Sequence, residues 1–373
     1  MADARRVCDY NHVATARYFH LFISETKELH MSNVTQTIRN TWVPLVLATV
    51  VLTTLFPGNE TAMSDERKSS TKTESLSDSA VEKMLEDVSN WGRWGKDDEL
   101  GTLNLITPET RRRAASLVKE GVSVSMAHDL IKQPFDDSEP FEHEIMMNVV
   151  NQELGGAGDR YSIQYHGFAH THIDALCHIF WKDKMYNGFG TENVAAGRGK
   201  ASIKMVKDGI FTRGVLMDMP SLFGVRYLKG EQAIRPAHLE AWEQKTGIRV
   251  KAGDAVLVHT GRWTRRENEG PWKIMQNSAG LHISCLKWLH ERNVAIVGSD
   301  LALDVMPSGS EKYELPVHLG VVVQMGMCIL DCLDYRAVSV ECRERKTWEF
   351  LLTVAPLRVE GGTGSPVNPI ATF

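Results

Sequence analysis

Short runs of strand-forming residues alternate with amphipathic stretches along the chain after about position 80. The strand-like runs are rich in Val, Ile, Thr and aromatic residues, and four of the five are six to nine residues long, close to the usual length of β-strands. They lie at 122–130, 160–175, 214–219, 254–261 and 295–300. Strands therefore dominate the middle of the chain.

Helical patterns flank and separate these runs. Ser79 and Glu82 form a capping box ahead of the segment AVEKMLEDV, which predicts a helix there. Pro108 follows Thr107 and predicts the first turn of a second helix, which Gly121 would end. Two further helices are expected at 236–246 and 281–291.

This mixture of elements predicts an α/β fold with a single domain, in which helices flank a mixed β-sheet. The domain is expected over 82–373, about 290 residues, because no internal repeat and no second low-complexity segment interrupts it. The length of 373 residues would also allow two domains.

Residues 1–81 are interpreted as an N-terminal leader rather than as part of this domain. An uncharged apolar run of fifteen residues at 42–56 is shorter than the roughly 20 residues of a membrane span. It resembles the apolar region of a signal or anchor at 31–62, although no clear cleavage site follows, and a buried strand or helix is the alternative. The polar stretch 61–77 is typical of a disordered linker. Export, membrane contact through 42–56 and a cytoplasmic location stay open.

Composition changes this picture at three points. The chain has 42 basic against 47 acidic residues and a formal charge of −5, so no nucleic-acid partner is expected. Six scattered cysteines do not form a disulfide framework. Of the 14 histidines, however, four fall between positions 166 and 178, which is far above their average density.

This histidine cluster predicts a metal site. Side chains on a strand alternate between its two faces, so His170, His172 and Asp174 are expected on one face. Two imidazoles and a carboxylate suit Zn or Mn better than Ca or Mg. Since no cysteine pair is near, an open catalytic site is more plausible than a closed structural one, and His166 is a further candidate ligand.

The segment from Thr171 to His178, THIDALCH, resembles the metal-binding signature of the cyclase family of metal-dependent hydrolases, which includes kynurenine formamidases and isatin hydrolases. Three other stretches resemble the same family, and the likeness spans about 82–373. They are WGRWGKDDELGTLNLITPE, VLVHTGRW with the downstream VAIVGSD, and PLRVEGGTGSPVNPIA. The resemblance implies a swivelling β/β/α-like fold.

The resemblance also implies roles for individual residues. His172 and Asp174 match metal ligands, and Asp174, with two oxygens, can bridge two ions. His178 matches the histidine that carries a proton beside the metal. The first histidine of the signature is replaced by Phe168, so His170 is expected to substitute for it. The distant ligands correspond to His318 and Asp331.

The activity implied is hydrolysis of a C–N bond in an amide, formamide or lactam by metal-activated water, similar to an arylformamidase of tryptophan catabolism. Lactone or ester hydrolysis on the same site, and an inactive metal-binding scaffold, are the alternatives. A small-molecule substrate and a homo-oligomer are expected. Trp94, His259 and Arg262 are candidate substrate contacts, while Cys177 would face away from His172 on a strand and is a weak nucleophile candidate.

Overall fold

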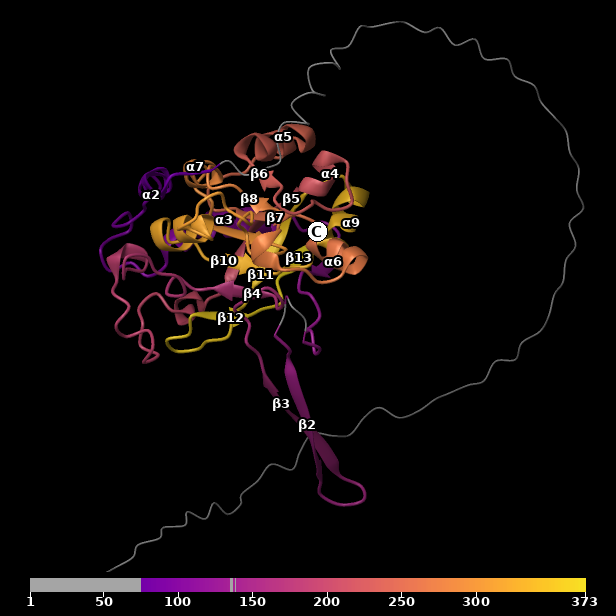
Figure 1. The fold of residues 1–373 in the computed structure, drawn as a ribbon. Coiled ribbons are helices and arrows are strands. Elements are labelled where there is room, and N and C mark those ends of the chain that lie inside the picture. The colour runs from indigo at the N-terminus through magenta and orange to yellow at the C-terminus, as the bar shows by residue number, and fades with distance from the viewer. Residues whose placement is uncertain (1–74, 135–136, 138) are drawn as a thin grey trace, which may run out of the picture. The chain divides into compact units, whose positions relative to one another are not determined.

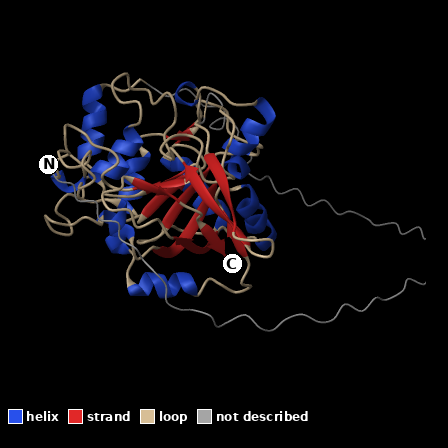
Figure 2. Cartoon of the chain, turned by 90° about the horizontal axis from the view of Figure 1, so that it is seen from below, coloured by secondary structure: helices blue, strands red, loops and turns tan. Residues whose placement is uncertain are grey.

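A mixed sheet of nine strands forms the centre of the fold in the computed structural model, which describes residues 75–134, 137 and 139–373. The strand order is β1-β13-β11-β5-β7-β9-β10-β4-β12, and Figure 2 shows the sheet between helices. The strands are β1 (Ser123–Ser125), β4 (His172–Asp174), β5 (Ile210–Asp218), β7 (Ala255–His259), β9 (Ile296–Ser299), β10 (Ile329–Asp331), β11 (Glu349–Val354), β12 (Gly364–Pro366) and β13 (Ile370–Thr372).

The middle of the sheet is parallel and buried on both faces. Strands β5, β7, β9 and β10 pair in parallel, whereas β11 joins β5, and β4 joins β10, in the antiparallel sense. Along β7, Val256 and Val258 belong to the core on one face, and Leu257 belongs to the core on the other. Burial on two sides explains why β7 has an almost continuous apolar sequence.

Helices cover both faces of the sheet. Residues of α2, α5 and α7 pack into the same core as Val256, and residues of α9 pack into the core of Leu257. The helices are α2 (Asp78–Glu86), α3 (Pro108–Ala115), α4 (Met219–Phe223), α5 (Pro236–Thr246), α6 (Arg262–Glu269), α7 (Cys285–Glu291), α8 (Pro316–His318) and α9 (Arg336–Arg345). All described residues belong to one compact unit.

Two small sheets lie apart from the central one. Strands β6 (Ala233–Ile234) and β8 (Gly280–Leu281) form a short parallel pair. Strands β2 (Glu142–Val149) and β3 (Gly155–Ser162) form an antiparallel hairpin that extends away from the sheet as a long ribbon (Figure 1). We refer to residues 142–162 as the β2–β3 arm.

The predicted α/β fold with a mixed sheet and flanking helices is confirmed. Helix α5 has the predicted bounds, and α2 begins at Asp78, one residue before the predicted cap, with Ser77 as the actual N-cap. The predicted strand 160–175 is wrong as one element, because it comprises the end of β3, a bend and the short β4. Helix α3 ends at Ala115, ahead of Gly121.

The interpretation of residues 31–62 as a signal or anchor, and of 42–56 as an apolar segment, lies outside the described residues. Within residues 75–134, 137 and 139–373, none of the helices has the length and apolarity needed to cross a membrane. The boundary at 82 stays a prediction.

Candidate metal centre

Strand β4 presents two of the predicted ligands on one face. It lies between β10 and β12, where His172 is opposite Asp331 and Asp174 is opposite Gly364. Ile173, between the two, is fully buried in the hydrophobic core on the opposite side. The alternation of side chains along a strand therefore directs His172 and Asp174 together, away from that core.

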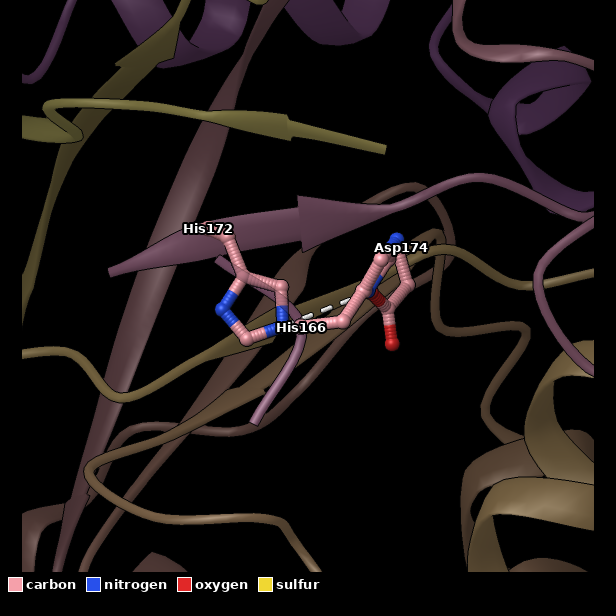
Figure 3. A group of neighbouring side chains, drawn as sticks. All are labelled: His166, His172 and Asp174. Carbon is pink, nitrogen blue, oxygen red and sulfur yellow. Dashed lines mark ion pairs between the residues drawn. The ribbon is translucent and has the colours of Figure 1, made fainter. Parts of the chain in front are cut away.

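His166 joins this pair from the loop that follows the β2–β3 arm (Figure 3). Its Nδ1 is 2.9 Å from Oδ1 of Asp174, and its ring is edge-on to the ring of His172, with ring centres 5.4 Å apart. The other nitrogen, Nε2, is 3.0 Å from the hydroxyl of Thr363, so the ring is held from both sides.

His318 and Asp331 complete the cluster on the other side of Asp174. His318 lies at the end of α8, and Asp331 lies at the end of β10. Nε2 of His318 is 3.2 Å from Oδ2 of Asp331. Two groups of three residues result, and in each group the potential ligand atoms lie within 4.8 Å of one another. One group is His166, His172 and Asp174, and the other is Asp174, His318 and Asp331. Asp174 therefore belongs to both.

The donor atoms of this cluster fit a divalent metal ion. His172, Asp174, His318 and Asp331 are buried. Oδ1 of Asp174, Oδ1 of Asp331 and Nδ1 of His166 are buried atoms that make no hydrogen bond of good geometry among the described residues, although Nδ1 of His166 and Oδ1 of Asp174 lie 2.9 Å apart. Buried polar atoms are normally hydrogen-bonded, so two carboxylate oxygens and a ring nitrogen that lack such bonds at one point are the donor set that a cation would take. Imidazole and carboxylate donors together suit zinc or manganese.

The surroundings keep the carboxylate charged. Burial alone would raise the pKa of Asp174, but the contacts with His166 and His172 and the nearby His178 hold it well below its usual range. An ionised carboxylate is the form that binds a metal ion.

Hydrogen bonds fix which nitrogen of two histidines faces the cluster. Nδ1 of His172 is 2.7 Å from the carbonyl oxygen of His170, and Nδ1 of His318 is 2.6 Å from Oδ2 of Asp304. Because Nδ1–H donates in both cases, Nε2 is the nitrogen that both rings direct toward the carboxylates. The adjacent carboxylates raise the pKa of both rings, and a metal ion would take the place of the proton on Nε2. Asp304 is itself held by the backbone N–H groups of Val317 and His318.

His178 lies beside the cluster rather than within it. Its ring stacks on the ring of His166 with centroids 3.7 Å apart, and its Nε2 is 3.8 Å from Oδ2 of Asp174. The side chain is 26% exposed, which leaves it open to a small molecule. Burial lowers the pKa of His178 to about 4, so the ring is neutral at neutral pH.

Comparison with known proteins assigns the family. Residues 102–304, more than half of the chain, match the family described as putative cyclase. The chain belongs to the putative cyclase family. Among solved structures, one described as a novel cyclase is 28% identical, with a TM-score of 0.69, and the match covers 76% of this chain and 99% of that chain. No curated protein matches the chain.

More distant cyclase-family structures share less of the sequence. Isatin hydrolase A from Labrenzia aggregata is 19% identical over 69% of this chain and 94% of its own, with a TM-score of 0.49. A predicted metal-dependent hydrolase from Bacillus stearothermophilus is 14% identical over 68% of this chain and 98% of its own, with a TM-score of 0.41.

In this member of the cyclase family, the position of His170 differs from the sequence-based expectation. His170 lies in a bend before β4, and its Nε2 is 2.8 Å from the carbonyl oxygen of Glu139. It belongs to neither group of potential ligands among the described residues. The alternation argument required a strand at 170, but β4 begins at His172, and His166 instead approaches Asp174.

Two of the three candidate substrate contacts are buried and bonded within the protein, and the third is partly exposed. His259 is buried, with Nδ1 3.2 Å from Oδ1 of Asp218, and Arg262 is buried against the carbonyl of Phe168 and the carboxylate of Asp137. These two side chains are therefore engaged with the protein's own groups. Trp94 is partly exposed and stacks under the guanidinium of Arg93.

Sequence reasoning missed three contributors to the centre: Asp304, Thr363 and Gly364. No spacing rule connects Asp304 to His318, which lies fourteen residues later. Gly364 appears in the sequence analysis only within the stretch PLRVEGGTGSPVNPIA, yet a Cβ there would lie 2.5 Å from the carbonyl oxygen of Ile173 and 2.9 Å from Cε1 of His166. Glycine is thus required for His166 to approach β4.

Proposed function

We propose that this chain is a metal-dependent hydrolase that cleaves a C–N bond of a small amide, formamide or lactam, with arylformamidase-like chemistry. The observation that carries the proposal is the buried donor cluster centred on Asp174, in which three buried atoms lack a hydrogen bond of good geometry, with a partly exposed histidine next to it. Membership in the putative cyclase family is consistent with this reading.

Five residues would hold the metal: His166, His172, Asp174, His318 and Asp331. A bound zinc or manganese ion would supply Lewis acidity and lower the pKa of water at the centre. Asp174 contributes atoms to both groups and is the residue that would join two ions if both groups are filled. Asp304 and the carbonyl oxygen of His170 keep Nε2 of the two buried histidines available for coordination.

His178 would carry the proton that hydrolysis requires. Its ring is neutral, faces Asp174, and is open on one side to solvent. A neutral imidazole can accept a proton from the attacking water and donate it to the amine that leaves when the C–N bond breaks. The stacking on His166 fixes the orientation of the ring, and it therefore supports directed transfer of the proton.

The proposal is tested by metal analysis joined to a substrate panel. Purified protein, His172→Ala, His178→Ala and the control His290→Ala are measured for bound zinc and manganese and for turnover of an aromatic formamide, a lactam and an ester. His290 is a half-buried histidine of α7 that bonds Asn90, so its loss removes an imidazole outside the centre.

We expect His172→Ala to lose metal and activity, and His178→Ala to keep metal but lose at least about 100-fold in turnover, the usual size of general acid–base catalysis. Preferential turnover of the ester would favour the lactone or ester alternative. A wild-type protein that binds no metal and hydrolyses none of the compounds would support the inactive scaffold and overturn the proposal.

A further inference from the structure

The side chain of His170 is buried beside the metal centre without belonging to it. The residue is 1% exposed and is in neither group of potential ligands among the described residues. Its Nε2 is 2.8 Å from the carbonyl oxygen of Glu139, whereas its buried Nδ1 has no hydrogen-bond partner in the described part of the chain. A carbonyl oxygen can only accept, so Nε2 carries the proton and donates it. The imidazole is therefore used as a donor to the backbone.

The carbonyl group of the same residue orients a metal ligand. Nδ1 of His172 is 2.7 Å from the carbonyl oxygen of His170, and Nε2 of His172 is 3.4 Å from Oδ1 of Asp174. A histidine ligand normally donates its second N–H to an acceptor of this kind, which fixes the rotation of the ring. The peptide group of His170 must therefore stay in place for Nε2 of His172 to face the centre.

The side chain of His170 is what holds this peptide group. Residues 166–170 form a bend before β4, so they are outside the hydrogen-bond ladder of the sheet. Among residues that the structure describes, the backbone of His170 makes no hydrogen bond to another backbone group. The contact from Nε2 to Glu139 therefore replaces the hydrogen bonds that a strand would have supplied at this position.

The neighbours of His170 are held by separate contacts on either side. Nη2 of Arg262 donates to the carbonyl oxygen of Phe168, and the hydroxyl of Thr171 donates to the carbonyl oxygen of Cys332 at 2.7 Å. These two contacts leave the peptide group between them to be fixed by the His170 side chain.

The acceptor of this hydrogen bond lies on a segment that is itself fixed at two points. The carboxylate of Asp137 is buried, and its Oδ2 is 3.3 Å from Nη2 of Arg262. Phe141 is buried, and its N–H donates to the carbonyl oxygen of Ile131 at 2.7 Å. Glu139 lies between these two residues, so its carbonyl oxygen is a firm support for His170.

We propose that His170 is a positioning residue of the metal centre: its side chain is tied to Glu139 so that its carbonyl oxygen holds His172 in the orientation that binds metal. The inference rests on the proposed function, because it concerns a ligand of that centre. A ligand that is oriented before the ion arrives loses less conformational freedom on binding. The hydrogen bond to Glu139 therefore raises the affinity for metal without taking part in coordination.

Two amide substitutions separate this role from coordination. In His170→Gln, the amide N–H₂ can occupy the position of Nε2 and donate to Glu139. In His170→Asn, the shorter amide reaches only the position of Nδ1, where the wild type has no partner among the described residues. The matched control is His290→Asn, because the half-buried His290 also uses Nε2 for its side-chain hydrogen bond, which joins it to Asn90 at 3.1 Å.

Each full-length variant is first checked for cooperative thermal unfolding. The zinc dissociation constant is then measured by competition with a chelator, and the absorption spectrum of the cobalt-loaded protein reports the geometry of the ligands. We expect His170→Asn to weaken zinc binding about 10–100-fold, the usual effect of removing a contact that orients a histidine ligand, and to change the cobalt bands. His170→Gln and His290→Asn should keep the wild-type zinc affinity and the wild-type cobalt bands.

The outcomes distinguish this inference from the proposed function. Wild-type zinc affinity in His170→Asn would overturn the inference while the metal centre stands. An equal loss of zinc affinity in His170→Gln and His170→Asn would show that the imidazole itself binds the ion, and it would overturn the inference as well. A wild type that binds no metal would overturn both.

A measurement on the wild type keeps the inference testable if His170→Asn does not fold. The imidazole ¹⁵N chemical shifts of His170, assigned by their absence in His170→Gln, report which nitrogen carries the proton. We expect the proton on Nε2 both before and after zinc is added. Loss of this proton when zinc binds would show that His170 is a ligand and would overturn the inference.

Discussion

Replacing Asp304 with Asn should weaken metal binding although Asp304 is not itself a ligand. Its two carboxylate oxygens accept three hydrogen bonds: Oδ1 accepts from the N–H of Val317 at 2.6 Å, and Oδ2 accepts from the N–H and Nδ1–H of His318 at 3.1 and 2.6 Å. All of these groups are buried. Asp304 therefore fixes both the position of His318 and the location of its ring proton.

Asparagine has one acceptor oxygen and cannot replace both carboxylate oxygens. If its oxygen faces Val317, its amide N–H₂ faces Nδ1 of His318, and the ring is driven to the tautomer with Nε2 protonated. If its oxygen faces His318, the N–H of Val317 is left unpaired, at a cost of about 1–3 kcal/mol. Loss of such an orienting group typically reduces metal affinity 10–100-fold, which corresponds to about 1.4–2.7 kcal/mol.

The assay is competition for zinc with a chromogenic chelator, which yields a dissociation constant without reference to activity. The matched control is Asp300→Asn, which also removes a buried carboxylate. Asp300 accepts the N–H groups of Thr260, Gly261 and Arg262 at the start of α6, and among the described residues none of the five candidate ligands donates a hydrogen bond to it. We expect Asp300→Asn to lower thermal stability but not zinc affinity. Wild-type zinc affinity in Asp304→Asn would refute the reasoning.

Three further predictions concern Gly364, the bound metal and the surface carboxylate of Glu82. Gly364→Ala should displace His166 and weaken zinc binding, which the same competition assay measures. The control Gly156→Ala, whose added Cβ has open space, should leave zinc binding unchanged. Equal zinc affinities of the two variants would contradict the close approach of Gly364 to His166. Removal of metal by a chelator should lower the unfolding temperature of the wild type but not of His172→Ala, since that variant has lost the stabilising ion. The pKa of Glu82 is lowered to about 2 by its contacts with Tyr313, Lys312 and Lys182. The ionised carboxylate therefore stabilises the fold above the unfolded pKa near 4.5, and this contribution is lost as the pH falls toward 2. The difference in unfolding temperature between wild type and Glu82→Gln should accordingly shrink as the pH is lowered from 6 to 3.5. A difference that stays constant would show that the charge of Glu82 does not cause the stabilisation.

Local patterns in the sequence were sufficient for part of the centre. The alternation of His172, Ile173 and Asp174 predicts two ligands on one face, and the buried Ile173 on the opposite side agrees with it. The start of α5 after Arg235 was likewise encoded locally, by proline at the first helical position. Both features depend on residues that are neighbours in the chain.

The remaining parts depend on tertiary contacts. Strand β4 pairs with only three residues each of β10 and β12 and begins at His172. The alternation of side chains between the two faces of a strand therefore does not apply at His170. The partner strands β10 and β12, together with the bend at Gly167, decide that His166 rather than His170 approaches Asp174. Gly167 has a φ of 144°. The pairing of His318 with Asp304 connects helix α8 to the segment that follows β9, and it leaves no periodic signal in the sequence.

The β2–β3 arm was also not predicted. Its second strand begins Gly155-Gly156-Ala157-Gly158, a composition that disfavours strands and is typical of turns. The pairing of these glycines with the apolar residues of β2 becomes visible only in the register of the hairpin.

The central claim is that Asp174 is the shared residue of a metal centre. Metal content of the purified protein after saturation with zinc, compared between wild type and Asp174→Ala, tests this most directly. We predict one or two tightly bound ions per chain in the wild type and none in Asp174→Ala, because both groups of ligands include this carboxylate. Wild type without bound metal, or Asp174→Ala with the full complement, would contradict the account.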